Sequence, residues 1–188
     1  MALYVRIYSN KSEWEHYMNF RFAEMDDLAQ LKSVFEKIIE KMNAENGRIW
    51  DDVYPCCCFE EDIKNRRLYV LEDDGVILSA FALWALEPDD ERNALIWESD
   101  PAKAMYFGRF GVNVNSRKSG IGSIMIANAA AAARDKGAEY LRVFVAEKNK
   151  PAIHFYLKNG FEKTNVIYDE ALDDDFVLRQ FGFEKKLK

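Results

Sequence analysis

The stretch from Tyr106 to Ile126 constrains the fold of this chain more than any other segment. Residues 106–114 mix aromatic and β-branched side chains with interleaved polar residues, which is typical of a β-strand. Residues 115–122 contain two glycines and few large apolar side chains, and a helix-forming run rich in alanine then continues to Ala133. The sequence therefore predicts a strand, a short turn and a helix in direct succession.

The predicted turn is suited to binding an anion. The first backbone N–H groups of a helix have no partner inside it, and the aligned peptide dipoles place partial positive charge at that end. Gly120 and Gly122 leave room for phosphate oxygens to approach the backbone, and Arg117 and Lys118 add cationic charge at the rim. The spacing is Arg-x-x-Gly-x-Gly, and the common dinucleotide and P-loop glycine motifs are both absent. Taken alone, the turn is equally compatible with a plain connection between a strand and a helix.

Length and hydropathy narrow the class of protein. The chain has 188 residues, of which 49% are hydrophobic, and this is enough for one domain with a substantial core. No apolar run approaches the roughly 20 residues that span a bilayer. The N-terminus lacks the basic segment and apolar stretch of a secretory signal. We therefore expect a cytoplasmic protein without a membrane partner.

Charge and cysteine spacing narrow the class further. The formal net charge of −6 disfavours nucleic acid as the main partner and is compatible with a cationic amine substrate. A net charge that serves only solubility is the alternative. The cysteines are consecutive, at 56–58, which argues against a disulfide framework, and no Cys-x-x-Cys or histidine pair accompanies them. We expect a reducing environment and no metal site.

Hydrophobic periodicity and turn residues outline the rest of the chain. Residues 1–18 form an N-terminal extension with a strand-like alternation at 3–8, and residues 19–188 are expected to form a single domain. Asp26 is expected to cap a helix whose apolar residues recur every three or four positions up to Met42. The other expected elements are a short strand over 19–23, an aromatic loop and short helix over 50–63, a hairpin of 67–72 and 76–83, a strand piece over 94–100, a strand over 141–145 parallel to the central strand, a helix from Pro151 to Gly160, and a closing hairpin of 162–168 and 176–184 around 169–175.

A second motif follows the strand at 141–145 and reads Asn149-x-x-Ala152-Ile153-x-Phe155-Tyr156-x-x-x-Gly160-Phe161. Together with the turn at 117–122, it resembles the GNAT N-acetyltransferase superfamily, whose patterns are Gln/Arg-x-x-Gly-x-Gly/Ala and Asn-x-x-Ala-x-x-x-Tyr-x-x-x-Gly-Phe. The motifs occur in the family's order, and the resemblance covers residues 19–185. It implies an α/β (α+β) fold with a mixed, mostly antiparallel central sheet, a splayed parallel strand pair and flanking helices.

The resemblance also implies acetyl-CoA as co-substrate and assigns residues to it. Main-chain groups of Val112 and Val114 would bind the pantetheine arm, and amides of residues 117–122 would hold the diphosphate. Asn149 would hydrogen-bond near the pantetheine or stabilise the splay, and Tyr156 would face the thioester sulfur as the catalytic residue. The full set expected to contact the donor is Val112, Asn113, Val114, Arg117, Lys118, Ser119, Gly120, Ile121, Gly122, Ser123, Asn149, Ala152, Phe155 and Tyr156.

The chain departs from the family at the general base. An amine like that of lysine has a pKa of ~10.4, so freeing its lone pair at pH 7 costs roughly 4.6 kcal/mol. Some family members place a glutamate about eleven residues before the arginine of the first motif, where this chain has Tyr106. A neutral tyrosine cannot act as a base. Glu72, Glu98 and Asp100 could act through a water, but each is better explained as a solvated surface carboxylate.

Tyr156 is expected to act mainly as a hydrogen-bond donor. With an intrinsic pKa of ~10 it is protonated at neutral pH and can donate to the departing sulfur. Complete proton transfer to a thiolate of pKa ~8.5 is uphill by roughly 2 kcal/mol, so hydrogen-bond stabilisation should come first. The alternative is a tyrosine that only packs in the core.

Other residues carry weaker functional interpretations. His154 is expected to be exposed, and a cysteine nucleophile for a ping-pong route is not needed if the amine attacks directly. The acidic turn at 173–175 could recruit a cationic acceptor or simply be solvated. Trp50, Tyr54 and Trp84 could line an acceptor pocket or pack in the core.

The sequence thus predicts an acetyl-CoA-dependent N-acetyltransferase that acts on a primary amine, of a small molecule or of a peptide or protein, by direct attack. One rival is a non-catalytic acyl-CoA-binding module, which the missing strand glutamate favours and the presence of Tyr156 and Asn149 disfavours. Another is an interaction protein that uses the fold as a scaffold. The sequence does not name the acceptor, and a homodimer formed through the closing hairpin is a further expectation from the family.

Overall fold

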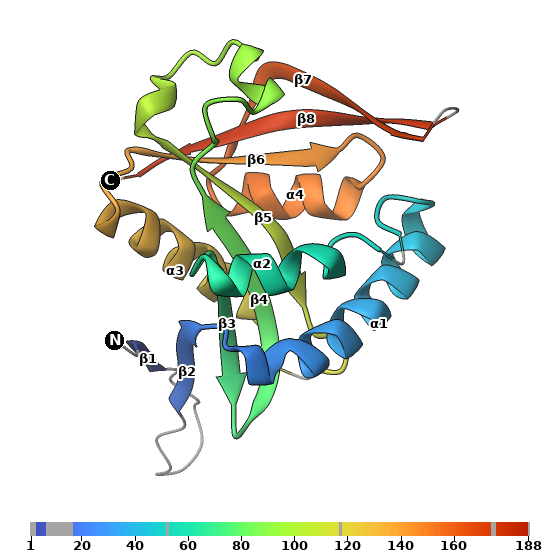
Figure 1. Ribbon diagram of the computed structural model, residues 1–188, viewed down its shortest axis with the longest axis vertical. Coiled ribbons are helices and arrows are strands. Elements are labelled where there is room, and N and C mark those ends of the chain that lie inside the picture. The colour runs from blue at the N-terminus through green and yellow to red at the C-terminus, as the bar shows by residue number, and fades with distance from the viewer. Residues whose placement is uncertain (1–2, 7–16, 52, 117, 174–175, 188) are drawn as a thin grey trace. The chain divides into compact units, whose positions relative to one another are not determined.

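The computed structural model describes residues 3–6, 17–51, 53–116, 118–173 and 176–187 (Figure 1). The chain divides into two compact units. The first comprises Met1–Glu40, Trp50–Ala82 and Arg109–Met125, and the second Lys41–Ile49, Leu83–Gly108 and Ile126–Lys188.

The first unit contains antiparallel strands in the order β1-β2-β3-β4. Their bounds are β1 Leu3–Arg6, β2 Tyr17–Phe22, β3 Leu68–Asp73 and β4 Val76–Trp84, the last of which ends in the second unit. Both central residues of the β3–β4 turn have a positive φ, 48° at Asp74 and 77° at Gly75, as a type I′ hairpin requires. The predicted Asp-Gly hairpin is confirmed, and part of the N-terminal extension is a strand.

The long helix α1, Leu28–Asn46, has the predicted apolar stripe, with Leu31, Phe35 and Ile39 buried. The prediction that Asp26 caps it is wrong. A short 3₁₀ turn η1, Met25–Asp27, precedes the helix, and the Asp27 carboxylate accepts a 2.7 Å hydrogen bond from the Glu24 N–H. Asp27 also forms an ion pair with Arg21 of β2, at 2.6 Å. This contact holds Asp27, rather than Asp26, in place immediately before the helix.

The aromatic loop after α1 leads into a 3₁₀ turn η2, Cys56–Cys58, and a short helix α2, Phe59–Lys64, as predicted. α2 packs against β3, and its buried Phe59 meets Phe35 of α1 edge-to-face, with ring centroids 4.8 Å apart. In Figure 1 α2 is the teal helix drawn across β3 and β4.

The second unit contains strands in the order β5-β6-β8-β7. Their bounds are β5 Ala104–Val112, whose last residues belong to the first unit, β6 Tyr140–Ala146, β7 Glu162–Asp173 and β8 Phe176–Lys186. β5 and β6 are parallel, with Ala104 opposite Tyr140, whereas β6–β8 and β7–β8 are antiparallel. The predicted parallel pair and the closing hairpin are confirmed.

Two helices accompany these strands. α3, Ile121–Asp135, begins in the first unit and continues into the second, and α4, Lys150–Lys158, packs against β7. Gly137 and Gly160 follow the two helices with φ values of 85° and 79°, and the predicted end of the second helix at Gly160 is confirmed.

One predicted strand does not form, and the predicted ends of two other strands are wrong. The strand expected at 94–100 is replaced by irregular backbone between 3₁₀ turns η3, Glu91–Ala94, and η4, Pro101–Lys103. Side chains explain this, because Asp90 accepts from the Arg92 N–H and Asp100 from the Ala102 N–H, both at 2.9 Å. β5 ends at Val112, and β7 continues to Asp173, so most of the turn expected at 169–175 is strand and residues 174–175 lie outside the described residues.

Candidate functional site

The turn between β5 and α3 is fixed by Asn113, which is 9% exposed. Its side-chain Nδ2 donates to the Ile77 carbonyl at 2.9 Å, and its backbone N–H donates to the Leu78 carbonyl at 2.8 Å. Its Oδ1 accepts from the Asn115 N–H at 3.0 Å, so the side chain is occupied at both ends. Asn113 therefore fastens the start of the turn to β4.

The end of the turn presents backbone donors. The Lys118 N–H donates to Ser116 Oγ at 3.3 Å, and the Ile124 N–H makes the first bond of α3 to the Gly120 carbonyl at 3.1 Å. Between them, the amides have no acceptor among the described residues; they belong to Ser119, Gly120, Ile121, Gly122 and Ser123. Gly120 is exposed, with φ at 81° and no other group within 4 Å of where a Cβ would lie. A row of N–H groups thus opens a 15-residue helix, where the peptide dipoles favour an anion.

The sequence predicts two cations at the rim of the turn, Arg117 and Lys118. Lys118 Nζ is ion-paired with Asp73 at the end of β3. Arg117 lies outside the described residues. Of the two valines expected to bind the donor, Val112 ends β5 half-buried, and Val114 is 37% exposed within the turn.

The second motif begins with a helix cap. Asn149 is the N-cap of α4, where its Oδ1 accepts from the Ala152 N–H at 3.1 Å, and its Nδ2 lies 3.8 Å from Met42 Sδ. Ala152 and Phe155 are half-buried, and His154 is exposed as expected.

Tyr156 is 6% exposed and lies among aromatic rings. Its ring meets those of Phe107, Phe155 and Phe161 edge-to-face, with centroids 6.3, 5.4 and 5.2 Å away. Burial raises the pKa of Tyr156 well above its ordinary value. The hydroxyl therefore stays protonated throughout the neutral range and can donate a hydrogen bond.

Tyr106 occupies the strand position where a base was considered, and its surroundings oppose that role. It is 4% exposed and packs against Trp84, Trp97 and Phe144, and burial raises its pKa. The guanidinium of the fully buried Arg142 lies 6.0 Å from its ring centroid. Tyr106 is a neutral core residue and is not suited to act as the base.

The carboxylates considered as alternative bases are otherwise engaged or exposed. Glu72 accepts from Arg21 at 2.6 Å and from Asn19 at 3.2 Å. Asp100 caps η4, and Glu98 is exposed. None of them is both available and sheltered from water, as a base with a raised pKa would be.

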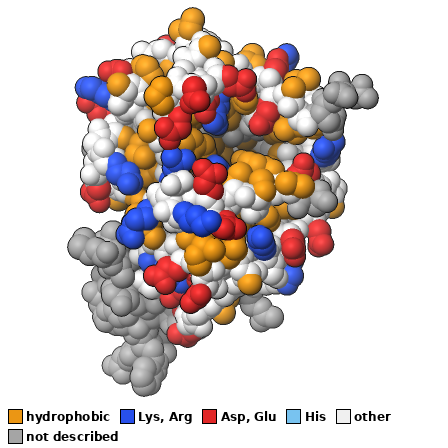
Figure 2. Space-filling view, in the orientation of Figure 1, with side chains coloured by type: hydrophobic (Ala, Val, Ile, Leu, Met, Phe, Trp, Pro, Cys, Tyr) orange, Lys and Arg blue, Asp and Glu red, His pale blue; other side chains and the backbone are white. Residues whose placement is uncertain are grey.

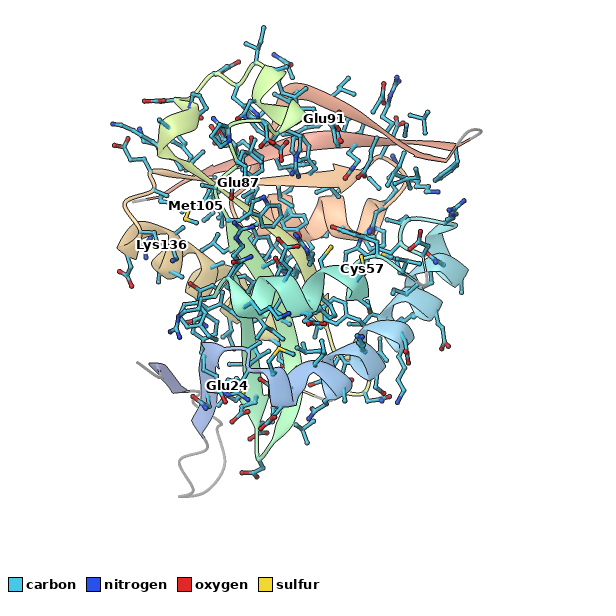
Figure 3. All side chains as sticks on the ribbon, in the orientation of Figure 1. Glu24, Cys57, Glu87, Glu91, Met105 and Lys136 are labelled. Carbon is cyan, nitrogen blue, oxygen red and sulfur yellow. The ribbon has the colours of Figure 1, made fainter. Side chains whose placement is uncertain are left out.

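Sequence reasoning missed two acidic residues, Glu170 on β7 and Glu91 on η3. Glu170 is half-buried, burial raises its pKa, and it accepts from Gln180 Nε2 at 2.8 Å. Nearby, the Tyr168 hydroxyl donates to Glu91, which Figure 3 labels on η3. The alternation of residues 166–170 in β7 could have indicated which side chains share a face, but it could not place them beside η3.

The aromatic residues considered for the acceptor belong to different clusters. Trp50 stacks on Phe35, 6.1 Å between centroids, and meets Tyr54 edge-to-face at 6.0 Å. Trp84 stacks on Tyr106 at 6.4 Å. These contacts are compatible with core packing and leave an acceptor role as a prediction.

The three cysteines are free thiols in η2, immediately before α2, and Figure 3 labels Cys57 among them. Cys57 Sγ and Cys58 Sγ are 3.6 Å apart, and burial together with this contact raises the pKa of Cys57. A thiol with a raised pKa is a poor nucleophile at neutral pH, which disfavours an acyl-enzyme route. Among the described residues no group of three or more His, Cys, Asp or Glu side chains could hold a metal ion.

Comparison with known proteins decides the family. Residues 32–161 match the model of the acetyltransferase (GNAT) family. The chain belongs to the GNAT family. No curated protein matches it.

Solved structures show the same fold at low sequence identity. An N-acetyltransferase from Staphylococcus aureus Mu50 is 19% identical with a TM-score of 0.64, over 91% of this chain and 99% of the other. A GNAT-family acetyltransferase from Streptococcus agalactiae is 20% identical with a TM-score of 0.71, over 91% and 96%. The yncA protein of Salmonella typhimurium, whose structure contains its cofactor acetyl-CoA, is 17% identical with a TM-score of 0.62, over 91% and 94%. The predicted mixed α+β fold is confirmed.

Family membership makes acetyl-CoA the co-substrate and acetyl transfer the general reaction. The residues fit such a donor, because the amides at the start of α3 that lack an acceptor in the described ranges offer hydrogen bonds to phosphate oxygens. On the face drawn in Figure 2, acidic and basic side chains are interspersed. No helix in the described part of the chain is long and apolar enough to cross a membrane.

Proposed function

We propose that this GNAT protein transfers the acetyl group of acetyl-CoA to a primary amine of a small molecule, peptide or protein by direct attack. The observation that carries the proposal is the run of amides from Ser119 to Ser123, at the start of α3, which have no acceptor within the described part of the chain. These amides would bind the diphosphate, Lys118 would add charge, and Arg117 would do the same from outside the described residues. The pantetheine would bind the backbone of Val112 and Val114.

The reaction joins the amine nitrogen to the acetyl carbon and breaks the carbon–sulfur bond. Acetyl-CoA supplies the activated acetyl group, as a thioester with a thiol leaving group. Tyr156 would donate a hydrogen bond to the sulfur as negative charge develops there, and its raised pKa keeps the proton on the hydroxyl. The proton lost by the amine passes to water, and the departing thiolate takes up a proton from water to leave as the free thiol.

Asn149 supports this assignment indirectly. Because its side chain caps α4, it sets the start of the helix that carries Ala152, Phe155 and Tyr156. Phe155 would line the channel of the donor, and Ala152 would allow close approach.

A binding assay and a turnover assay test the proposal separately. Acetyl-CoA at 100 times its dissociation constant should stabilise the fold by about 2.7 kcal/mol, read as a rise in melting temperature. Release of free thiol in the presence of an amine panel should then require both substrates. Tyr156→Phe should lower kcat by at least about tenfold and leave the affinity for CoA within about twofold.

Each outcome has a distinct meaning. Binding without thiol release for any amine supports the rival, a non-catalytic acyl-CoA-binding module. No rise in melting temperature supports the scaffold rival. Unchanged turnover of Tyr156→Phe removes the hydrogen-bond-donor role. Sedimentation of the free chain tests the further prediction of a homodimer through β7 and β8.

A further inference from the structure

The backbone of β5 is interrupted at Arg109. This residue has a φ of 49° in the interior of a strand, where an L-residue with a side chain rarely adopts the left-handed conformation. Such a conformation costs free energy and persists only where surrounding contacts enforce it. We therefore looked among the neighbours of Arg109 for a contact that stabilises its left-handed conformation.

The interruption separates two parts of the strand that are buried differently. Before it, Ala104, Tyr106 and Phe107 are buried, so both faces of the strand are covered there. Residues 108–110 are half-buried, and Gly111 and Asn113 are buried after them. Because a left-handed residue turns the backbone out of the extended path, the conformation of Arg109 sets the direction in which the following backbone faces.

A buried ion pair holds Arg109. Its Nε lies 3.0 Å from Asp62 Oδ2 of α2, and the two side chains are 16% and 3% exposed. Asp62 lies next to the buried Ile63, and burial raises its pKa although Arg109 acts in the opposite direction. The charges of Arg67 and Glu61 also act on Asp62, whereas Tyr54 and Cys58 adjoin the guanidinium. A carboxylate buried in this way depends on its cation, so the pair resists separation.

The segment that follows packs closely against α1. A Cβ at Gly111 would lie 2.7 Å from Ile38 Cδ1 and 2.9 Å from Phe35 Cζ, so a larger residue here would require these side chains to shift. The Gly111 carbonyl accepts from the buried Ser79 Oγ at 2.7 Å. A change of direction at Arg109 would therefore be transmitted to Val112 and to the turn after it.

We propose that Asp62 and Arg109 are positioning residues for the acyl donor: their buried ion pair holds the left-handed conformation in β5 and so orients the backbone of residues 112–114. The inference rests on the proposed function, in which the main-chain groups of Val112 and Val114 bind the donor. Neither side chain is required to touch the donor.

Glycine at position 109 separates this role from direct contact, since glycine adopts positive φ without a side chain to hold it. Asp62→Asn and Arg109→Ala should each weaken CoA binding, measured calorimetrically, by about tenfold or more. The double variant Asp62→Asn/Arg109→Gly removes both charges and keeps the conformation accessible, and should bind CoA within about threefold of the wild type. Hydrogen exchange of amides 110–114 in the free protein should rise in the first two variants and recover in the third.

A matched control removes an exposed ion pair from the same helix. Glu60 and Lys64 are 2.5 Å apart with side chains 55% and 62% exposed, so Glu60→Gln should change neither CoA affinity nor exchange at 110–114. Equal losses for the alanine variant and the double variant would mean that Arg109 acts through its own side chain, and would overturn the inference. So would wild-type affinity and exchange in Asp62→Asn. A wild type that does not bind CoA would instead defeat the proposed function.

Discussion

At the scale of single residues, Tyr156 shows how burial decides chemistry. A tyrosine with an unperturbed pKa of ~10 would begin to lose its proton in a mildly alkaline assay. Burial raises the pKa of Tyr156 further, so the protonated form persists as the pH rises.

The first prediction concerns the pH profile of turnover. kcat/KM should rise with pH as the acceptor amine loses its proton, and should show no decline attributable to Tyr156 up to about pH 10. Tyr156→Phe should lower the whole profile without moving its acid limb. An alkaline decline that is present in the wild type and absent from the phenylalanine variant would contradict this.

Single residues also mark the limit of sequence reasoning. Tyr156 and Asn149 could be found because they lie in one motif at fixed spacing on one helix. Asp62 could not be paired with Arg109, because 46 intervening residues give no local signal and the left-handed conformation falls on an arginine rather than a glycine. Arg142 likewise reads as an alternating polar residue of a strand, yet it is fully buried, with Nε 2.8 Å from Glu184 and its guanidinium 4.3 Å from the Trp97 ring.

At the scale of elements, helix ends decide where the motifs are placed. Gly160 correctly predicted the end of α4, since a left-handed residue after a helix is a local property. The start of α1 was misplaced because Asp27, not Asp26, pairs with Arg21 of β2, and the local sequence does not show this tertiary contact. The false strand at 94–100 has the same origin, since the caps Asp90 and Asp100 outweigh the strand propensity of the apolar residues between them.

The second prediction tests the cap of α4. Asn149→Ala should destabilise the protein by about 1 kcal/mol in urea unfolding, because the Ala152 N–H loses its acceptor. Asn149→Asp keeps an acceptor at the N-cap and should retain most of the stability. An aspartate variant as unstable as the alanine variant would mean that the amide Nδ2, not the cap, carries the effect.

The third prediction concerns the junction of β2, η1 and β3, where Arg21 binds both Asp27 and Glu72 at 2.6 Å. Burial opposes ionisation of Asp27, but hydrogen bonds from Arg21 and from the Glu24 N–H outweigh it and lower its pKa. A lowered pKa adds stability that is present above the unfolded value, ~3.9, and is lost as the pH falls through the folded one.

The urea midpoint of the wild type should therefore fall more steeply below about pH 4 than that of Asp27→Asn. The two proteins should differ most at neutral pH. Parallel pH dependences would show that Asp27 ionises alike in the folded and unfolded states.

At the scale of the whole molecule, the two compact units share their main elements. α1, β4, β5 and α3 each begin in one unit and end in the other. Neither unit is a continuous piece of sequence, so neither can lose its strands and helices without breaking elements of the other. The sequence predicts one domain over residues 19–188 because it contains no segment with the composition of a linker.

The last prediction is that unfolding is a single cooperative transition. By size alone, 188 residues should absorb about 130 kcal/mol near 60 °C, and the van't Hoff enthalpy should equal the calorimetric one. Independent units would instead give two transitions or a van't Hoff enthalpy about half the calorimetric value. Saturating acetyl-CoA should shift a single transition as a whole, because a ligand that binds only the native state stabilises every element that unfolds with its site. A donor that shifts only part of the heat absorption would show that the units unfold separately, and would contradict the single-domain prediction.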